Sequence, residues 1–419
     1  MRQITSTIAS RVFVTAMNLL VMVLAGHALG ARGLGIIGLI VLGITLVMLP
    51  TNLIGGGALV YLVPKSRLWS LLVPSYAWAL VSCALCYLVL RVVHLVPVGF
   101  EAHICALAFL QGVYGIHLAV LVGQQRIGQH NVITAFHAVV LLIGFALLLN
   151  TSSTPDPVHY IHASYIAFAF TAILSGWSMR WDLQPAEDSG PVLPRLLRQG
   201  ALVQGANGLQ LLNYRLAYWL IERFREPAAL GIYTVGNQLS ESAWIAPRSL
   251  GMVLLSRVSN SAEAEHQRSM TLTTARAAMV LAFAVVFVLA VLPEEVFRFV
   301  FGPEIRGLRP IMLLLAPGII AMAASQAFSH YFSGKGDNVH NLVGSGAGMV
   351  VTVLAGPWMV STWGLWGAAT TASAAYGTSL LYQLIVFMRT THSAWSDLLP
   401  NRNDLQRVHD QVKTLLAGR

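Results

Sequence analysis

Charged residues are scarce in this chain. Asp, Glu, Lys and Arg make up 10% of its 419 residues, hydrophobic residues make up 56%, and the mean hydropathy is +0.67. An ordinary soluble domain carries about 25% charged residues. The composition therefore excludes a soluble protein and predicts a chain that is embedded in a membrane.

Residues that carry redox, metal or nucleophilic chemistry are also scarce. The three cysteines, Cys83, Cys86 and Cys105, fall in apolar stretches, where a thiol packs as a small hydrophobic group. The histidines of the apolar stretches are not paired at i, i+4 with acids or cysteines, as a metal-binding helix requires. No Gly-rich phosphate loop or nucleophile elbow occurs. We therefore expect no metal, no cofactor and no enzymatic activity.

Twelve apolar runs are long enough to cross a bilayer, which takes about 20 residues per helix. They lie near 10–29, 36–62, 69–91, 102–123, 131–149, 160–179, 199–221, 231–257, 274–293, 308–331, 341–360 and 364–389. The second and the eighth are long and contain Pro50 and Pro247, so we expect each to be tilted or kinked. The predicted fold class is an all-α integral membrane protein with twelve transmembrane helices.

Lys and Arg residues gather on one side of these spans. With both termini in the cytoplasm, 17 of the 26 fall on the inside, 7 fall in outer loops, and Arg215 and Arg248 lie within spans. Because positively charged loops stay in the cytoplasm, both termini are predicted to be cytoplasmic. This bias and the attraction of anionic lipid headgroups explain much of the net charge of +9, so we expect no nucleic-acid partner.

A proline-containing segment divides the spans into six and six. We expect an N-terminal six-helix lobe over 1–180, a cytoplasmic linker over 181–198, a C-terminal six-helix lobe over 199–389, and an amphipathic cytoplasmic tail over 390–419. Two such halves predict a substrate cavity between them, near the middle of the membrane. A short repeat agrees with duplication: GLGI precedes the second span and ALGI the eighth. The alternative is chance, helped by the general Gly and Pro richness of membrane helices.

Four segments of small and apolar residues follow one another along the chain. They are ALGARGLGIIGLIVLGITLVML (28–49), GIYTVGNQL (231–239), VFRFVFGPEIRGLRPIMLLL (296–315) and WGLWGAATTASAAYG (363–377). In this order they resemble the multidrug/oligosaccharidyl-lipid/polysaccharide exporter superfamily, and most closely its polysaccharide branch, the O-antigen flippases of the Wzx type. Each pattern is loose, and their order is the specific part of the resemblance.

The resemblance implies a two-lobed transporter that moves a polyprenyl-pyrophosphate-linked oligosaccharide from the cytoplasmic to the outer leaflet of a bacterial inner membrane by alternating access. It implies a role in the synthesis of O-antigen or another surface polysaccharide, with a polysaccharide polymerase and a chain-length regulator as further partners. The third segment departs from the family in carrying Ile305 and Arg306 where an aromatic residue is usual. The alternative is a cation-coupled multidrug exporter of the same superfamily.

A carrier of such a lipid needs cations for the diphosphate and hydrogen-bonding groups for the glycan. Arginine suits a diphosphate because its planar fork donates two hydrogen bonds at once. Arg215 is the leading candidate, since it shares a polar stripe on the seventh span with Gln204, Asn207 and Tyr218. The alternative is a buried arginine that pairs with a carboxylate or extends to the membrane interface.

Arg248 shares the eighth span with Asn237 and Glu241. At 100° per residue the three fall within about 40° of one another. Glu241 is the carboxylate that we place well inside a span, where a charge is costly unless it is paired or functional. Three roles remain open for it: a structural pair with Arg248, a cavity-lining pair that contacts substrate, and a proton or cation site.

Further polar residues lie on the first, second and fourth spans. Arg11 and Asn18 form a short stripe, in which Arg11 either meets the diphosphate at the cytoplasmic entrance or anchors the chain as a positive-inside residue. Asn52, Gln111 and Tyr114 suit sugar hydroxyls, but they equally satisfy contacts between helices.

Tryptophan is enriched where a span meets the lipid headgroups. Five tryptophans fall towards predicted outer ends or inside spans: Trp219, Trp244, Trp358, Trp363 and Trp366. We expect an interfacial belt to explain most of them.

Overall fold

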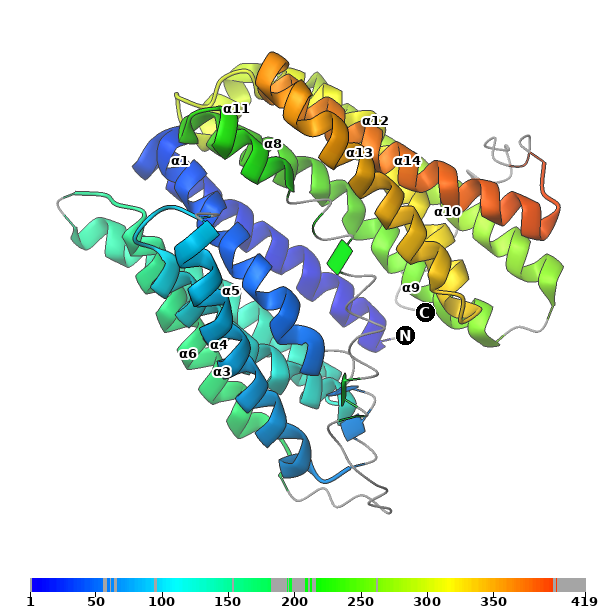
Figure 1. Ribbon diagram of the computed structural model, residues 1–419, viewed down its shortest axis with the longest axis horizontal. Coiled ribbons are helices and arrows are strands. Elements are labelled where there is room, and N and C mark those ends of the chain that lie inside the picture. The colour runs from blue at the N-terminus through cyan, green and yellow to red at the C-terminus, as the bar shows by residue number, and fades with distance from the viewer. Residues whose placement is uncertain are drawn as a thin grey trace. The chain divides into compact units, whose positions relative to one another are not determined.

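The computed structural model describes residues 2–55, 59–60, 62–63, 66–93, 96–152, 154–181, 216–260 and 263–394, with a few isolated positions. These residues form helices and connecting turns, and no strand occurs among them. The chain separates into two compact units, which we call the N-terminal unit (6–208) and the C-terminal unit (209–419, with the first five residues). In Figure 1 the colour runs from blue at the N-terminus, through the N-terminal unit, to green, yellow and red in the C-terminal unit.

The first two expected spans form one element in the structure. Helix α1 (Arg2–Thr51) contains Gly30 at φ 65° and ψ −171°, a non-helical conformation at which two helices meet. Glycine adopts this backbone readily because it has no Cβ. The remaining elements of the N-terminal unit are η1 (Asn52–Ile54), α3 (Leu68–Val93), α4 (Glu101–Gly123), α5 (Ile127–Thr151) and α6 (Val158–Ser178).

The end of α1 is shaped by Pro50. Pro50 offers no N–H to the carbonyl of Leu46, and after Thr51 the α-helix gives way to the 3-10 segment η1. The indole Nε1 of Trp78 on α3 donates to the Pro50 carbonyl over 2.8 Å. Thr51 Oγ1 lies 3.0 Å from Ser82 Oγ, also on α3. The expected interruption of the second span is therefore held in place by α3.

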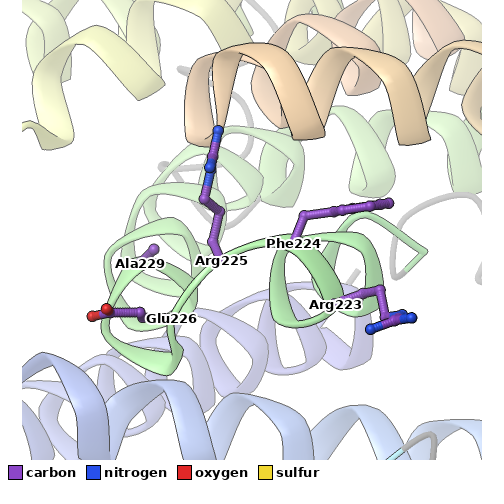
Figure 2. Close-up of a pocket in the computed structure, with 5 residues that line it drawn as sticks. All are labelled: Arg223, Phe224, Arg225, Glu226 and Ala229. Carbon is purple, nitrogen blue, oxygen red and sulfur yellow. The ribbon is translucent and has the colours of Figure 1, made fainter.

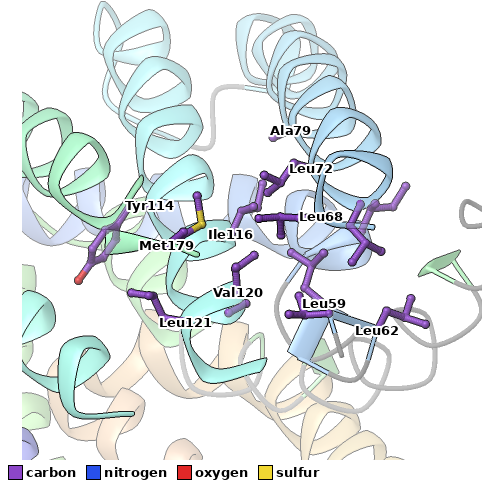
Figure 3. Close-up of a cluster of buried hydrophobic side chains, with 14 of the residues drawn as sticks. Leu59, Leu62, Leu68, Leu72, Ala79, Tyr114, Ile116, Val120, Leu121 and Met179 are labelled. Atoms are coloured by element: carbon purple, nitrogen blue, oxygen red, sulfur yellow. The ribbon is translucent and has the colours of Figure 1, made fainter. Parts of the chain in front are cut away.

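The interior of the N-terminal unit is apolar where α3 and α4 meet. Figure 3 shows side chains from both helices converging there, among them Leu72, Ala79, Ile116 and Val120. The outer faces of α3 and α6 carry exposed apolar side chains such as Leu88 and Trp177. Apolar surface on both the inside and the outside fits helices that pack together and also face lipid.

The C-terminal unit is built around α12 (Leu308–Gly334), which packs against α8, α9, α10 and α14. The elements in chain order are a helical stretch over 216–224, α8 (Pro227–Glu241), η3 (Ser242–Trp244), α9 (Ile245–Asn260), α10 (Ala264–Val291), α11 (Glu294–Phe301), α12, α13 (Val339–Trp363) and α14 (Leu365–Thr391). Figure 1 shows α12, α13 and α14 running alongside one another within this unit.

Eight of the described helical segments are long and apolar enough to cross a membrane, and one of them, Ala9–Ile54, covers two expected spans. The eighth expected span is divided between α8 and α9, which have 15 and 16 residues. Most of the expected span over 199–221 lies outside the described residues, as do nearly all of the expected linker and most of the expected tail. The chain is a multi-pass membrane protein.

Candidate functional site

The polar residues of the eighth expected span surround an interruption of the helix. Helix α8 begins at Pro227, which suits the first turn because the missing N–H has no helical partner there. It ends at Glu241, and the 3-10 segment η3 leads into α9. Pro247 lies three residues beyond η3 and offers no N–H to the carbonyl of Ala243, so the α-helical bonding cannot run through this point.

Asn237 is the centre of a polar cluster on α8. Its side chain is 1% exposed, and its Nδ2 donates to Glu241 Oε1 over 2.7 Å and to the Tyr218 hydroxyl over 3.3 Å. The ring of Tyr218 meets Tyr233 edge to face, with centroids 5.6 Å apart. The structure thus brings together three of the residues predicted as site residues, Tyr218, Asn237 and Glu241, from two helices of one unit.

Arg248 turns away from this carboxylate. Its guanidinium carbon lies 5.5 Å from the ring centroid of Trp244, and its side chain is exposed. No ion pair joins Arg248 to Glu241, both of which the structure describes. The three residues of η3 wind at about 120° rather than 100° each, which rotates Arg248 by about 60° from the face expected for an unbroken helix.

Trp244 does not belong to an interfacial belt. It is fully buried, and its Nε1 donates to the Ile319 carbonyl on α12 over 3.0 Å. By contrast, the exposed fractions of Trp358, Trp363 and Trp366 are 61%, 51% and 59%, as expected for side chains that face headgroups or lipid. The sequence signal that distinguishes Trp244 is its place three residues before Pro247, inside a stretch that also carries Asn, Glu and Arg.

The other predicted site residues are distributed as follows. Arg11 is exposed near the start of α1, close to His130 at the start of α5. Asn18 is half-buried on α1, and Asn52 is half-buried in η1. Three predicted residues lie outside the described part of the chain: Arg215, Gln204 and Asn207.

The N-terminal unit contains a buried network that sequence reasoning did not single out. His117 Nε2 lies 2.6 Å from the Tyr76 hydroxyl, and its Nδ1 lies 2.9 Å from the Ala172 carbonyl and 3.0 Å from Ser175 Oγ. A carbonyl only accepts, so Nδ1 carries a hydrogen; in the neutral ring, Nε2 accepts from the hydroxyl of Tyr76. This network joins α3, α4 and α6 through the imidazole of His117.

The predicted residues Gln111 and Tyr114 lie two turns and one turn before His117 on α4. Tyr114 is buried, and its ring stacks on His137 of α5 with centroids 5.2 Å apart. Gln111 is half-buried. Neither network has the make-up of a metal site, because no three His, Cys, Asp or Glu side chains of the described residues come together.

A pocket of about 530 Å³ lies at the corner between the 216–224 helix and α8, lined by Arg223, Phe224, Arg225, Glu226 and Ala229. In Figure 2 the side chains of Arg225 and Arg223 point in different directions, Arg225 towards α13. Arg225 Nη2 donates to the Ser361 carbonyl over 3.0 Å. The two guanidinium groups therefore do not converge on one anion.

Solved structures match this chain over nearly its whole length. A multidrug resistance MATE family transporter of the MOP superfamily, in an inward-facing conformation, is 14% identical with a TM-score of 0.71, over 90% of this chain and 94% of that one. The lipid II flippase MurJ, in an inward closed conformation, is 14% identical with a TM-score of 0.68, over 98% and 91%. A mutant of the Vibrio cholerae MATE transporter VcmN is 13% identical with a TM-score of 0.60, over 95% and 96%.

No protein-family model matches the sequence, and no curated protein matches it. At 13–14% identity the structural matches show a shared fold. The expected all-α membrane fold, with twelve helices in two lobes, is confirmed by this likeness. The three proteins are transporters or flippases rather than enzymes.

Proposed function

We propose that this protein is a flippase that moves a polyprenyl-pyrophosphate-linked oligosaccharide from the cytoplasmic to the outer leaflet of a bacterial inner membrane, for O-antigen or other surface polysaccharide synthesis. The observation that carries the proposal is the likeness to the lipid II flippase MurJ over 98% of the chain. The name of that protein states a lipid-linked substrate. Both termini are cytoplasmic in this proposal, because Lys and Arg predominate on that side.

The polar residues around η3 support this proposal. Asn237 and Glu241 are held inside a unit whose outer faces are apolar, and Arg248 presents an exposed guanidinium one turn beyond η3. A fork-shaped, permanently charged donor suits a diphosphate, whereas amide and hydroxyl groups suit a glycan. Arg215, Arg248 and Arg11 bind the diphosphate in this proposal. The glycan-binding residues are Asn18, Asn52, Gln111, Tyr114, Gln204, Asn207, Tyr218 and Asn237.

Replacement of the three arginines tests the diphosphate assignment. Arg215, Arg248 and Arg11 are changed singly to Ala and to Lys in a strain that depends on this protein for a surface glycan. We expect the Ala variants to reduce surface glycan by about tenfold or more and the Lys variants to retain part of it, because Lys keeps the charge without the fork. Arg223→Ala is the control, since Arg223 is an exposed arginine outside the proposed diphosphate site. Full function of all three Ala variants contradicts the assignment.

Cation-coupled export of drugs is the second candidate. The likeness to a multidrug resistance MATE family transporter and the presence of Glu241 on a broken span favour it. In that case expression of the protein lowers the drug susceptibility of a sensitised strain and leaves surface glycan unchanged. A polymerase and a chain-length regulator are partners only under the first proposal.

A further inference from the structure

Helix α12 has a weak turn at its centre. Pro317 offers no N–H to the carbonyl of Leu313, and the proline ring crowds that carbonyl. The next peptide is supported from outside: Ser373 Oγ of α14 donates to the Leu314 carbonyl over 2.5 Å and accepts from Gly318 N–H over 3.2 Å. These two groups are the i and i+4 partners of an unbroken helix. A hydroxyl from α14 thus bridges the turn that proline weakens.

The contact between α12 and α14 is close at this turn. A methyl group on Gly318 would lie 2.5 Å from the Cα of Ser373, so only glycine permits the hydroxyl to reach the turn. The two hydrogen bonds of Ser373 therefore depend on the close packing of α12 and α14 at Gly318.

Trp244 forms a hydrogen bond with the residue of α12 that follows Gly318. Its Nε1 donates to the carbonyl of Ile319, one residue beyond Gly318, over 3.0 Å. Its ring also meets Tyr376 of α14 at a centroid distance of 5.9 Å and an interplanar angle of 70°. A buried indole N–H is costly to leave without an acceptor, so this bond fixes the position of η3 on α12.

The indole ring of Trp244 also contacts the guanidinium of Arg248. The guanidinium carbon lies 5.5 Å from the ring centroid, within the range of a cation–π contact. Among the described residues no carboxylate pairs with Arg248, so the ring of Trp244 is what orients this cation. The side chain of Trp244 thus connects two features. One is the Pro317 turn of α12, which lacks a backbone hydrogen bond, and the other is Arg248, the charged group beside η3 in the eighth expected span.

We propose that Trp244 is a positioning residue for Arg248, and that it links the placement of this guanidinium to the Pro317 turn of α12. A rearrangement of α12 at Pro317 then moves Arg248, and an anion bound by Arg248 in turn stabilises one arrangement of α12. The inference rests on the proposed function where it concerns the anion. The mechanical link between Trp244 and α12 does not.

The first experiment measures binding of undecaprenyl pyrophosphate to the purified, full-length protein in nanodiscs. Trp244→Leu removes the ring and is expected to weaken binding by about threefold to tenfold, as Arg248→Ala does. The double variant is expected to bind no more weakly than Arg248→Ala alone, because both changes remove the same contact. Trp244→Phe keeps an aromatic face and is expected to bind nearly as the wild type.

The matched control is Trp78→Leu in the N-terminal unit. Trp78 makes the same kind of bond, from its indole to the carbonyl of Pro50, but among the described residues no cation contacts its ring. The Trp78→Leu variant is expected to leave the affinity for undecaprenyl pyrophosphate unchanged. Additive losses for Trp244→Leu and Arg248→Ala overturn the positioning role of Trp244.

The second experiment measures hydrogen exchange of α12 amides without any ligand. Ser373→Ala, Trp244→Phe and Trp244→Leu are each expected to raise exchange around residues 314–323 by about tenfold, whereas Trp78→Leu is expected to leave it unchanged. Unchanged exchange in both Trp244 variants overturns the link to α12. If Arg248→Ala binds the probe as the wild type does, the diphosphate assignment fails instead, and the exchange result still decides the link.

Discussion

In each unit an expected span is interrupted beside a proline, but the side chains near the interruption differ in charge between the two units. In the N-terminal unit, Pro50 precedes η1, and the side chains that bond to this segment, Trp78, Ser82 and Ser75, carry no charge. The buried network around His117, elsewhere in the same unit, contains no carboxylate or guanidinium. In the C-terminal unit, η3 precedes Pro247, and Glu241 and Arg248 flank it. A break in a helix therefore needs no charge to be stable. Among the described residues, charged side chains flank η3 but not η1, and this difference agrees with the proposed binding of a diphosphate in the C-terminal unit.

The largest effect is expected from Glu241→Gln. Glutamine keeps an oxygen that accepts from Asn237 Nδ2, so the variant removes the charge while it preserves the hydrogen bond. If the charge at this break serves transport, the rate falls by about tenfold or more at unchanged abundance in the membrane. Quantitative immunoblots with a flipping or export assay measure both, and Glu226→Gln at the exposed corner is the control. A normal rate removes Glu241 from the candidate site.

His117→Leu tests the other side of the comparison. The change leaves the Tyr76 hydroxyl without its partner, whereas the Ala172 carbonyl still accepts from Ser175 Oγ, and we expect a cost of about 1–3 kcal/mol of stability. Transport per folded molecule is expected to stay within about twofold of the wild type, because the network contains no carboxylate or guanidinium. Thermal unfolding of the solubilised protein gives the stability. Lost transport at unchanged stability shows that the N-terminal network takes part in function, and the contrast between the units then disappears.

Ser325→Ala supplies the neutral counterpart within the C-terminal unit. Ser325 Oγ donates to Gln383 Oε1 over 2.6 Å, and Gln383 Nε2 donates to Asn341 Oδ1 over 3.2 Å, a buried ladder across α12, α13 and α14. Loss of one donor is expected to cost about 1 kcal/mol and to leave transport unchanged. A transport defect larger than that of Glu241→Gln places the functional centre of this unit at the amide ladder rather than at η3.

The smallest effect is expected from Asp397→Asn. Asp397 forms an ion pair with Arg268 of α10. A hydrogen bond from the Ala394 backbone N–H and the neighbouring Arg268 hold the pKa of Asp397 below its usual range. A depressed pKa means that the contact contributes above the unfolded-state pKa of about 4 and is lost as the pH falls through the folded value. Asp397→Asn is expected to speed proteolysis after residue 394 at pH 7. Below the depressed pKa the variant and the wild type are expected to behave alike, and a difference that persists there contradicts this reading.

The membrane-spanning helices were accessible to sequence reasoning because the bilayer imposes a simple rule. A helix must offer about 20 apolar residues, and the runs expected near 102–123 and 308–331 coincide with α4 and α12. Pro50 and Pro247 lie beside the two interruptions, where a tilt or kink was expected, but Pro74, Pro317 and Pro357 lie inside continuous helices, so a missing N–H alone does not predict a break. The resemblance of the four segments implied a two-lobed fold of twelve helices, and the likeness to the solved structures supports that fold.

The candidate site was predictable only in part. Asn237 and Glu241 do meet, because four residues of regular helix separate them. Arg248 lies beyond a 3-10 segment whose winding the sequence did not reveal, and it stacks on Trp244 instead of joining them. Trp244 and its partner Ile319 are 75 residues apart along the chain. His117 is 41 residues from Tyr76 and 58 from Ser175, so no short sequence pattern predicts these bonds.

The sequence by itself determined that this protein spans a membrane with helices and which few charged residues lie inside the spans. Each of these follows from composition or from the chemistry of one residue, and lipid leaves the backbone few alternatives to a helix. The tertiary structure alone decided which polar groups satisfy one another. A buried indole or imidazole finds its acceptor on whichever helix packs against it, and helix packing assembles residues from distant parts of the chain. Trp244 shows the difference: its position in a span could be read from the sequence, but its link between Arg248 and α12 could not.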